Sequence, residues 1–394
     1  MMNRYFIKRC LASLLVLTLV LIQCLCLCGC KDLFGNLFSG NEKASADAAL
    51  YLAMDDAQRV DYLTEQIVSA AESGKSEAVF DFDCSDELFR AYNRVILDNP
   101  GLFWLTSTAL YNKTELNEKI RITLHLESDI TAKEKEIRKE KVNNAINLIL
   151  SNVDEDSSDY DKVLYIHDYL TDNVVYDSES ADIIINSKDN ENIPDAVEQS
   201  ASLYGALVNK KAVCSGYSAA FMYLANRLGL DCIRINGIEK EKNINHQWNC
   251  VKVDGDYYYI DVTWDDLDSD AELKFGRSYE FFLINYNELT ETHIIDEDIN
   301  PPECTAQKYN YYIYNGLYLE KYTKNAFSDI LSRNENKDCV TVKFSSDTEC
   351  KRAYALLFES GKQIWEMPSV ENRNLRTVNT AVSYSGRILT IKFG

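Results

Sequence analysis

Two strand-like runs joined by Asp254-Gly255 constrain this chain more than any other feature. The run HQWNCVKV precedes the dipeptide and DYYYIDVTW follows it. Asp-Gly between two such runs is a strong signal for a two-residue hairpin loop. In that hairpin Val253 pairs with Asp256. The sequence therefore predicts an antiparallel pair of strands whose register is fixed by the turn.

This register decides which side chains of the hairpin lie together. Counting back from the loop pairs Trp248 with Asp261. His246, two residues before Trp248, is then a diagonal neighbour of Asp261 on the same face, at a distance of about 7–8 Å. A three-residue loop would shift the register and put the two on opposite faces. We therefore expect Asp261 to hold the His246 imidazole. Taken singly, a surface-strand histidine and a strand-end carboxylate that caps an amide are the alternatives.

Cys214 lies where a helix is predicted to begin. In the run SGYSAAFMYLANRLGL that follows it, Ala220, Leu224 and Leu228 share one helical stripe. Gly229 is a stop signal. Free N–H groups and the helix dipole at such a start favour a thiolate, although an isolated cysteine there is more often a small core residue. A thiol nucleophile needs a base and an orienter, which His246 and Asp261 would supply.

Three segments together resemble the transglutaminase-like superfamily: DKVLYIHDYLTDNVVYD, VCSGYSAAFMYLANRLGL and HQWNCVKVDGDYYYIDVTWDD. The resemblance covers about residues 157–285, and the motifs match in order and spacing. It implies that Cys214 is the nucleophile, His246 the general base and acid, and Asp261 the orienter. It also implies a papain-like α+β core, in which the nucleophile helix packs on an antiparallel sheet. The pattern of the chain on either side predicts small α+β units that flank this core.

The superfamily includes transglutaminases, thiol peptidases and members with no demonstrated activity. We expect a thiol enzyme that attacks a carboxamide or peptide bond of a protein or peptide and forms an acyl-enzyme. Transfer to an amine acceptor and hydrolysis by water both stay open. The alternatives are a catalytically inactive surface binding module and a cysteine peptidase of the cell envelope. The resemblance calls for no cofactor.

Residues 1–30 are typical of a lipoprotein signal peptide. Three basic residues among the first nine precede an apolar run over residues 11–27. The closing LCGC resembles a bacterial lipobox and implies lipidation of Cys30. A retained signal anchor is the alternative, because the run is near the length that spans a bilayer. Both readings place the rest of the chain outside the cytoplasm, and we favour a protein lipid-anchored to a bacterial membrane.

The formal net charge of −21 excludes nucleic acid as a partner, because binding to phosphates requires a basic surface. Residues 1–30 carry three of the positive charges and no negative one, so their removal makes the chain more acidic still. Anionic wall polymers and phospholipid should repel such a surface. Contact with the membrane is therefore expected to depend on the anchor.

Cysteine and histidine usage indicates no metal site and no disulfide scaffold. Seven cysteines follow Cys30, an odd number without a CxxC motif, and only four scattered histidines are present. Cys232 and Cys250 lie in neighbouring strand-like runs, where both a disulfide and two buried thiols stay open. The acidic run from Asp265 to Asp270 lacks the glycine and the later Glu of a calcium loop, so a solvated loop is expected.

About 365 residues beyond the signal peptide exceed what one hydrophobic core usually supports. The composition predicts a flexible tether over 31–47, an N-terminal α+β unit over 48–155, a transglutaminase-like catalytic domain over 156–300 and a C-terminal α+β unit over 301–394. The last unit opens on a strand-like run, YNYYIYNGLYLEKY.

The two flanking units share a short internal similarity. FDCSDELFRAY at 82–92 and FSSDTECKRAY at 344–354 align without gaps, with Phe, Glu, Arg, Ala and Tyr at coinciding positions. Each is predicted to be a strand, a cap and a helix. We hypothesise that the flanking units are related modules; chance similarity is the alternative.

Other aromatic residues are candidates for substrate binding. Trp264 follows Asp261 by three positions and could wall the site. Trp248 could shield the bond between His246 and Asp261 from water. Tyr204 could line the cleft, although for all three packing in the core is the alternative. His167 is interpreted as a structural histidine on a helix.

Overall fold

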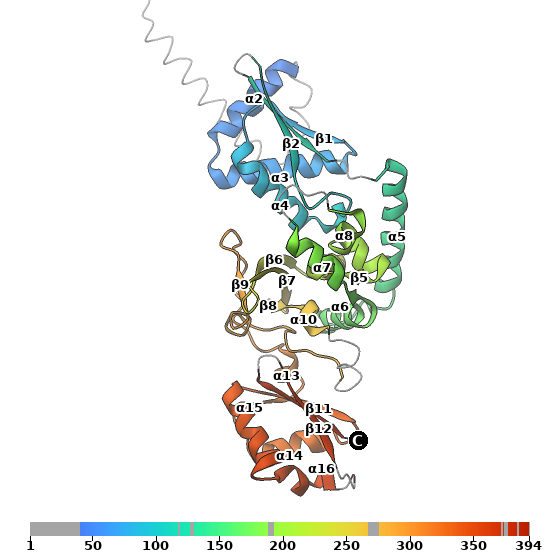
Figure 1. The fold of residues 1–394 in the computed structure, drawn as a ribbon, viewed down its shortest axis with the longest axis vertical. Helices are drawn as coiled ribbons and strands as arrows, with labels where there is room; N and C mark the ends of the chain where they lie inside the picture. Colours follow the sequence, from blue (N-terminus) through green and yellow to red (C-terminus); the bar gives the residue numbers. More distant parts are fainter. Residues whose placement is uncertain are drawn as a thin grey trace, which may run out of the picture.

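Three units follow one another along an elongated molecule in a computed structural model of the chain (Figure 1). Each unit has a hydrophobic core, and the central unit has a second, smaller cluster that includes Ile235 and Trp248. The structure describes residues 40–116, 119–126, 130–187, 193–266, 276–371, 373, 377–383 and 386–393. The predicted signal peptide, Cys30 and most of the tether lie outside these residues. Within the described part, no helix has the length and apolar character needed to cross a membrane.

The N-terminal unit packs helices on a small antiparallel sheet of strand order β1-β3-β2. Its elements are α2 (Gly40–Ala53), α3 (Asp56–Glu72), β1 (Glu77–Phe80), α4 (Ser85–Asp98), the 3-10 turn η2 (Pro100–Leu102), β2 (Leu110–Leu116) and β3 (Lys119–His125). Asp55 caps α3 through a capping box with Gln58. Leu63 of α3, Leu88 of α4 and Ile122 of β3 are among its buried core residues.

The central unit begins with helices and short connecting strands. They are α5 (Ala132–Leu150), α6 (Asp159–Asn173), β4 (Val175–Tyr176), α7 (Ser178–Asn186), α8 (Asp195–Ser200), the π-helical turn η3 (Gly205–Asn209), β5 (Lys211–Ala212) and α9 (Cys214–Arg227). An antiparallel sheet of order β8-β7-β6-β9 follows. Its strands and the adjoining helices are β6 (Cys232–Glu239), β7 (Ile244–Val253), β8 (Asp256–Ile260), α10 (Val262–Asp265), α12 (Tyr286–Leu289) and β9 (His293–Ile295).

Helix α9 lies at the centre of this unit, packed against β6, β7 and α6. Ala220 and Leu224 of the predicted stripe are fully buried, and Leu228, just past the helix, is partly buried against the same core. Gly229 follows the helix with φ +82°, a left-handed conformation that favours glycine. The predicted arrangement, a helix that starts at Cys214 and packs on an antiparallel sheet, is confirmed.

The hairpin has the predicted register. Val253 pairs with Asp256, and the ladder continues back to the pair Asn249 and Ile260. Asp254 and Gly255 have φ values of 55° and 99°, as a tight two-residue turn between twisted strands requires. Strand β8 ends one residue before Asp261, so the chain leaves the sheet where the candidate carboxylate stands.

The C-terminal unit has a sheet of order β10-β11-β13-β12, in which β10 and β11 are parallel and the other pairs antiparallel. Its elements are α13 (Tyr311–Tyr314), β10 (Tyr318–Leu319), α14 (Lys324–Arg333), β11 (Cys339–Phe344), α15 (Asp347–Tyr354), η4 (Ala355–Glu359), η5 (Gln363–Glu366), α16 (Pro368–Glu371), β12 (Val378–Val382) and β13 (Ile388–Phe393). The predicted opening strand was wrong, because that run forms the short helix α13, a turn and only two strand residues.

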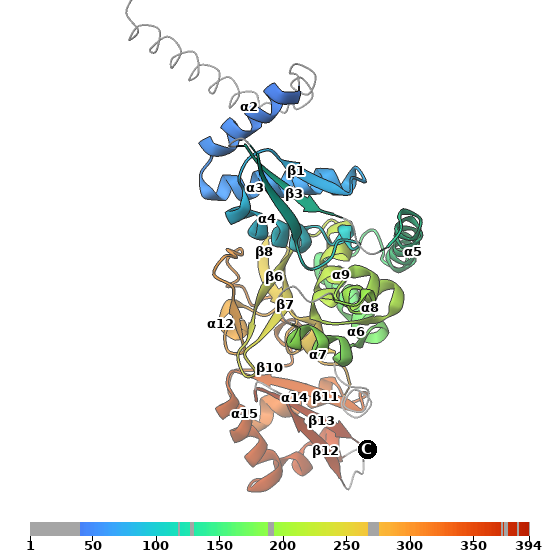
Figure 2. The same cartoon turned by 45° about the horizontal axis from the view of Figure 1, so that its top comes forward.

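The two flanking units have the same order of main elements. The series α3-β1-α4-β2-β3 has its counterpart in α14-β11-α15-β12-β13, and the sheets run β1-β3-β2 and β11-β13-β12. Extended without gaps, the sequence alignment places the first residues of β1 and β11 together, and likewise those of α4 and α15. Ala91 and Ala353 are both fully buried. Topology and register therefore support the hypothesis of two related modules at opposite ends of the molecule (Figure 2).

Helix α5 differs from its expected place. The sequence alone assigned it to the N-terminal unit, whereas Val142, Ile146 and Ile149 pack into the central core.

The buried thiols also differ from the pairing considered above, since the sulfur of Cys250 lies 3.4 Å from that of Cys304. Cys304 belongs to the segment after β9, which the sequence pattern does not connect with β7.

Gly237 of β6 offers a test of this packing. It pairs with His246, and a Cβ there would lie 2.1 Å from the Ile294 carbonyl oxygen and 2.5 Å from the Trp248 ring. We expect Gly237→Ala to lower the free energy of unfolding by about 1–3 kcal/mol or more, since overpacking forces the backbone to shift. Urea denaturation measures this. Gly101→Ala, whose Cβ would meet a movable Tyr223 ring at 3.3 Å, is the control. An unchanged midpoint for Gly237→Ala would contradict the packing.

Candidate functional site

Cys214, His246 and Asp261 meet at the junction of three elements. Cys214 is the first residue of α9, His246 lies on β7, and Asp261 is the N-cap of α10. The Nε2 atom of His246 lies 2.6 Å from Oδ2 of Asp261, and the Cys214 sulfur is hydrogen-bonded to His246. The structure therefore brings the three predicted residues together, with His246 in contact with Cys214 on one side and with Asp261 on the other.

Asp261 is held rigidly by the helix that it caps. Its Oδ1 accepts hydrogen bonds from the backbone N–H groups of Thr263, at 3.0 Å, and Trp264, at 3.2 Å. The other oxygen is thereby directed to His246. Burial raises the pKa of the Asp261 carboxyl, but the charge and hydrogen bonds of the neighbouring histidines outweigh burial and hold that pKa well below its usual range. Asp261 is thus an ionised carboxylate.

His246 is buried, and its protonated form is strongly stabilised. Burial lowers the pKa of the imidazole, but the charge and hydrogen bond of Asp261, followed by those of Cys214, raise it to about 10. Since Nε2 is bonded to Asp261, Nδ1 is the ring nitrogen that remains for the cysteine. The carboxylate therefore fixes both the orientation of the ring and the role of each nitrogen.

The environment of Cys214 favours a thiolate. Burial raises the pKa of the thiol, but the hydrogen bond and charge of His246, together with the Gln247 backbone, bring it below its ordinary value. The start of α9 adds the positive end of a helix dipole. The residue as a whole remains partly exposed. A thiolate and an imidazolium, stabilised by one buried carboxylate, are the protonation states that this geometry supports.

A second histidine, which the sequence pattern did not single out, contacts the same carboxylate. His293 of β9 is fully buried, and its Nε2 lies 3.2 Å from Oδ2 of Asp261. Its Nδ1 lies 2.7 Å from the Thr292 hydroxyl. Only the pairing of β9 with β6 brings it there. In the sequence, the only indication of a role for His293 was that the chain has just four histidines.

The His246, Asp261 and His293 side chains are also close enough to be considered as metal ligands, with their donor atoms within 4.8 Å of one another. Both rings direct Nε2 to one carboxylate oxygen, which is the arrangement of two hydrogen bonds to a shared acceptor. A metal ion would have to displace both bonds. We therefore interpret the cluster as a hydrogen-bonded one.

Two tryptophans enclose the histidines. The Trp248 ring is buried and stacks on His246 at a centroid distance of 5.9 Å. The half-buried Trp264 ring lies 4.6 Å from His293 and 5.9 Å from His246. Both rings thus pack against the histidines, and the shielding of the His246–Asp261 bond by Trp248 stays a prediction. Whether either residue contacts a substrate stays a prediction.

Tyr204 is a buried core residue, whereas Tyr176 is exposed near Cys214. Tyr204 is buried in the central core, where its ring stacks on Phe103 at a centroid distance of 5.8 Å and faces the Arg138 guanidinium. These are core contacts. Tyr176, which sequence reasoning missed, is 41% exposed, and its strand β4 pairs with β5 just before Cys214. Burial and then the charge of Cys214 raise its pKa to about 12, so it presents a neutral phenol beside the thiolate.

His167 belongs to a separate buried network, in agreement with its structural interpretation. Its Nδ1 lies 3.0 Å from Asp168 and its Nε2 3.3 Å from Asp265 at the end of α10. Asp265 also accepts a bond from the Phe281 N–H, and the Phe281 carbonyl accepts one from the Asp261 N–H. The network therefore anchors α10. Asp265 already has these protein donors, and positions 268 and 270 lie outside the described residues.

A family model described as the transglutaminase-like superfamily matches residues 147–262. The chain is 24% identical over 198 residues to the Kyphoscoliosis peptidase of Mus musculus, a match that covers 46% of this chain and 28% of that protein. The chain thus spans less than a third of the length of this curated relative.

Solved structures with weaker similarity include a TGase, 18% identical with a TM-score of 0.29, covering 49% of this chain and 52% of that one. A candidate cysteine protease from Cytophaga hutchinsonii is 11% identical with a TM-score of 0.25, covering 51% of this chain and 80% of that one. The family match, which spans the segment that carries Cys214, His246 and Asp261, shows that residues 147–262 of this chain belong to the transglutaminase-like superfamily.

Proposed function

We propose that the protein is a thiol enzyme that cleaves a carboxamide or peptide bond of a protein or peptide substrate through an acyl-enzyme on Cys214. The observation that carries this proposal is the continuous contact from Cys214 through His246 to the buried Asp261. A thiolate is the reactive form of cysteine, and an adjacent imidazolium both stabilises it and supplies a proton.

In the first half-reaction the Cys214 sulfur attacks the carbonyl carbon, and a C–S bond forms as the carbonyl π bond opens. Within α9 the N–H groups of Gly216 and Tyr217 both bond to the Val213 carbonyl. The N–H groups of Cys214 and Ser215 then have no intrahelical acceptor and are the donors for the oxyanion. The C–N bond breaks as His246 gives its proton to the leaving amine or ammonia, which leaves a thioester.

In the second half-reaction His246 takes a proton from the incoming nucleophile, which attacks the thioester and releases Cys214. An amine gives acyl transfer, and water gives hydrolysis. Tyr176 and Trp264 lie beside the thiol and the histidines, where the substrate must approach. We propose them as contacts that select between acceptors, since both could restrict the access of water to the thioester.

We also propose that the chain is exported and lipid-anchored through Cys30. The support is the basic, apolar and LCGC pattern of residues 1–30. The acidic remainder of the chain, of formal charge −24 after removal of three basic residues from −21, has no affinity of its own for an anionic membrane.

Acyl transfer and hydrolysis are tested together by incubating the full chain with glutamine-rich proteins and a fluorescent amine, and by following amine incorporation, ammonia release and peptide cleavage. We expect at least one of the three, reduced about 10³-fold or more by Cys214→Ala. Asp261→Asn should lower the rate on the order of 10²-fold or more, because the imidazolium loses its counter-charge. Equal turnover by Cys214→Ala would refute the mechanism. If Cys214 showed only the reactivity of an ordinary thiol, that would favour a surface binding module.

Membrane attachment is tested by fractionating cells that express the full chain with Cys30→Ala. We expect the wild-type protein in the detergent phase with a lipid mass added to a new N-terminal Cys30. The variant should lack that mass, since only a cysteine at this position can be acylated. An unmodified, uncleaved N-terminus in the wild-type chain would instead establish the signal-anchor alternative.

A further inference from the structure

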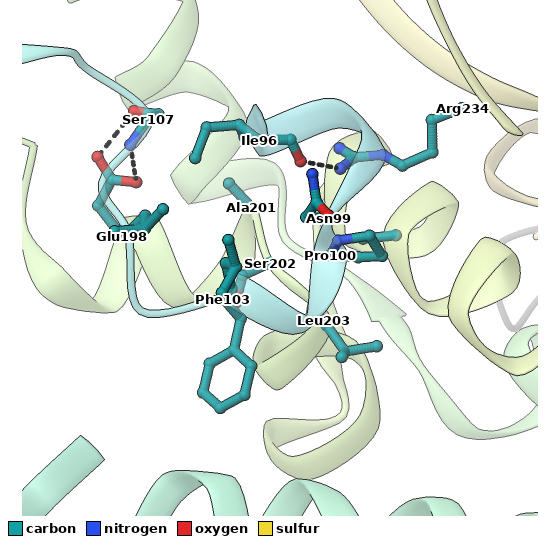
Figure 3. A pocket seen from close by; sticks show the side chains of 13 residues that line it. Ile96, Asn99, Pro100, Phe103, Ser107, Glu198, Ala201, Ser202, Leu203 and Arg234 are labelled. Carbon is teal, nitrogen blue, oxygen red and sulfur yellow. Dashed lines mark hydrogen bonds between the residues drawn. The ribbon is translucent and has the colours of Figure 1, made fainter. Parts of the chain in front are cut away.

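Arg234 of β6 is a buried cation that the proposed reaction does not use directly. It lines a pocket between the N-terminal and central units, together with Asn99, Pro100, Phe103 and Glu198 (Figure 3). Only 4% of the residue is exposed. A buried charge is costly unless its hydrogen bonds are satisfied, so the contacts of this guanidinium identify what it is for.

One side of the guanidinium faces the N-terminal unit. Nη1 donates to the carbonyl of Ile96 at 2.9 Å and lies 3.4 Å from that of Leu97. Both carbonyls belong to the last turn of α4, where backbone oxygens have no partner within the helix. A cation at this end also complements the helix dipole. Arg234 therefore fastens the C-terminus of α4 to the central sheet.

The other side of the guanidinium faces the candidate catalytic residues. Nη2 donates to the Ser215 carbonyl, at 3.3 Å, and to the Gln247 side-chain oxygen. Ser215 directly follows Cys214, and Gln247 directly follows His246. The Gln247 backbone N–H is itself hydrogen-bonded to the Cys214 sulfur. One side chain thus holds the residue after the nucleophile and the residue after its base.

Among the residues that the structure describes, no carboxylate forms an ion pair with Arg234. Its Nε lies 3.3 Å from the Ser218 hydroxyl, and, among the described residues, all of its hydrogen bonds go to neutral oxygens. The negative groups that act on it are Cys214, as thiolate, and Asp98. Burial lowers the pKa of Arg234 to about 10, which leaves it protonated at neutral pH. Its field therefore favours the ionised form of the thiol.

We infer that Arg234 is a positioning residue that couples the N-terminal unit to catalysis: it fixes Ser215 and Gln247 on either side of the Cys214–His246 pair and ties both to the last turn of α4. This inference rests on the proposed function. The N-terminal unit is then a structural part of the active centre, and displacement of α4 changes the reactivity of Cys214.

The test is the pH dependence of iodoacetamide alkylation of Cys214 in the full chain, mapped by mass spectrometry, with thermal unfolding measured in parallel. The wild-type chain and His246→Ala calibrate the assay. Arg234→Met removes the charge and all five donors. Arg234→Lys keeps the positive charge, but a single ammonium cannot make the hydrogen bonds of the planar guanidinium to α4 and to the Ser215 and Gln247 side at once. Gln247→Met removes one acceptor and keeps the backbone N–H, so it remains informative if Arg234→Met does not fold.

We expect the wild-type rate to rise with pH through a lowered thiol pKa, so that labelling is already fast at a pH where an ordinary thiol is still protonated. His246→Ala should abolish this. Arg234→Met should raise the midpoint by about one pH unit, which slows labelling at low pH on the order of tenfold. Arg234→Lys should restore part of the effect, and Gln247→Met should shift the midpoint in the same direction as Arg234→Met.

Arg138→Lys is the matched control. Arg138 is a poorly exposed arginine that bridges Glu134 and Asp195, so its replacement should lower thermal stability without moving the midpoint. If the Arg234 and Gln247 variants lose stability and keep the wild-type midpoint, Arg234 is only a helix cap and the inference is overturned. If wild-type Cys214 labels like an ordinary thiol, the proposed function itself fails, and the inference fails with it.

Discussion

The Asp261 carboxylate, buried at the N-terminus of α10, is the charge on which the rest of the site depends. Two backbone N–H groups fix one of its oxygens, and the His246 and His293 imidazoles approach the other. A buried carboxylate is stable only when such donors are in place. Three elements supply these donors: α10 gives the two backbone amides, β7 gives His246 and β9 gives His293. The charge of His246 then favours a thiolate at Cys214, so the reactivity of the cysteine follows from the position of one carboxylate.

The architecture keeps this group of charges in a fixed place. Helix α9 is buried along most of its length and carries Cys214 to the end of β7, while the His167–Asp265 contact holds the far end of α10. The N-terminal unit is connected to the same site through Arg234, because this guanidinium donates hydrogen bonds both to the last turn of α4 and to the Ser215 carbonyl. Two modules that share the strand orders β1-β3-β2 and β11-β13-β12 lie at the two ends of the molecule, and the second has the additional parallel strand β10 (Figure 1). In the described contacts, only the N-terminal one reaches the residue next to the nucleophile.

Local patterns predicted the parts of this site that are close in sequence. The Asp-Gly turn fixed the register of β7 and β8 and hence the contact of His246 with Asp261, and the helical stripe located the start of α9. The pattern could not find His293, Tyr176 or Arg234, because each reaches the site through pairing between distant strands or units. The run after residue 307 was misread, since alternating tyrosines resemble a strand whereas tertiary packing makes four of its residues a helical turn. Helix α5 was assigned to the wrong core because its apolar residues show amphipathicity but not the partner they pack against.

His246 is charged at neutral pH, because it is paired with a thiolate on one side and a carboxylate on the other. Nitrogen NMR of the imidazole rings in the full chain, followed as a function of pH, measures this charge directly. We expect an imidazolium that persists through neutral pH and loses its proton near pH 10. Cys214→Ala should lower that midpoint, because the thiolate is one of the groups that raise the pKa of His246. A neutral His246 ring at about pH 7 in the wild-type chain, beside a protonated Cys214, would show that no thiolate–imidazolium pair exists.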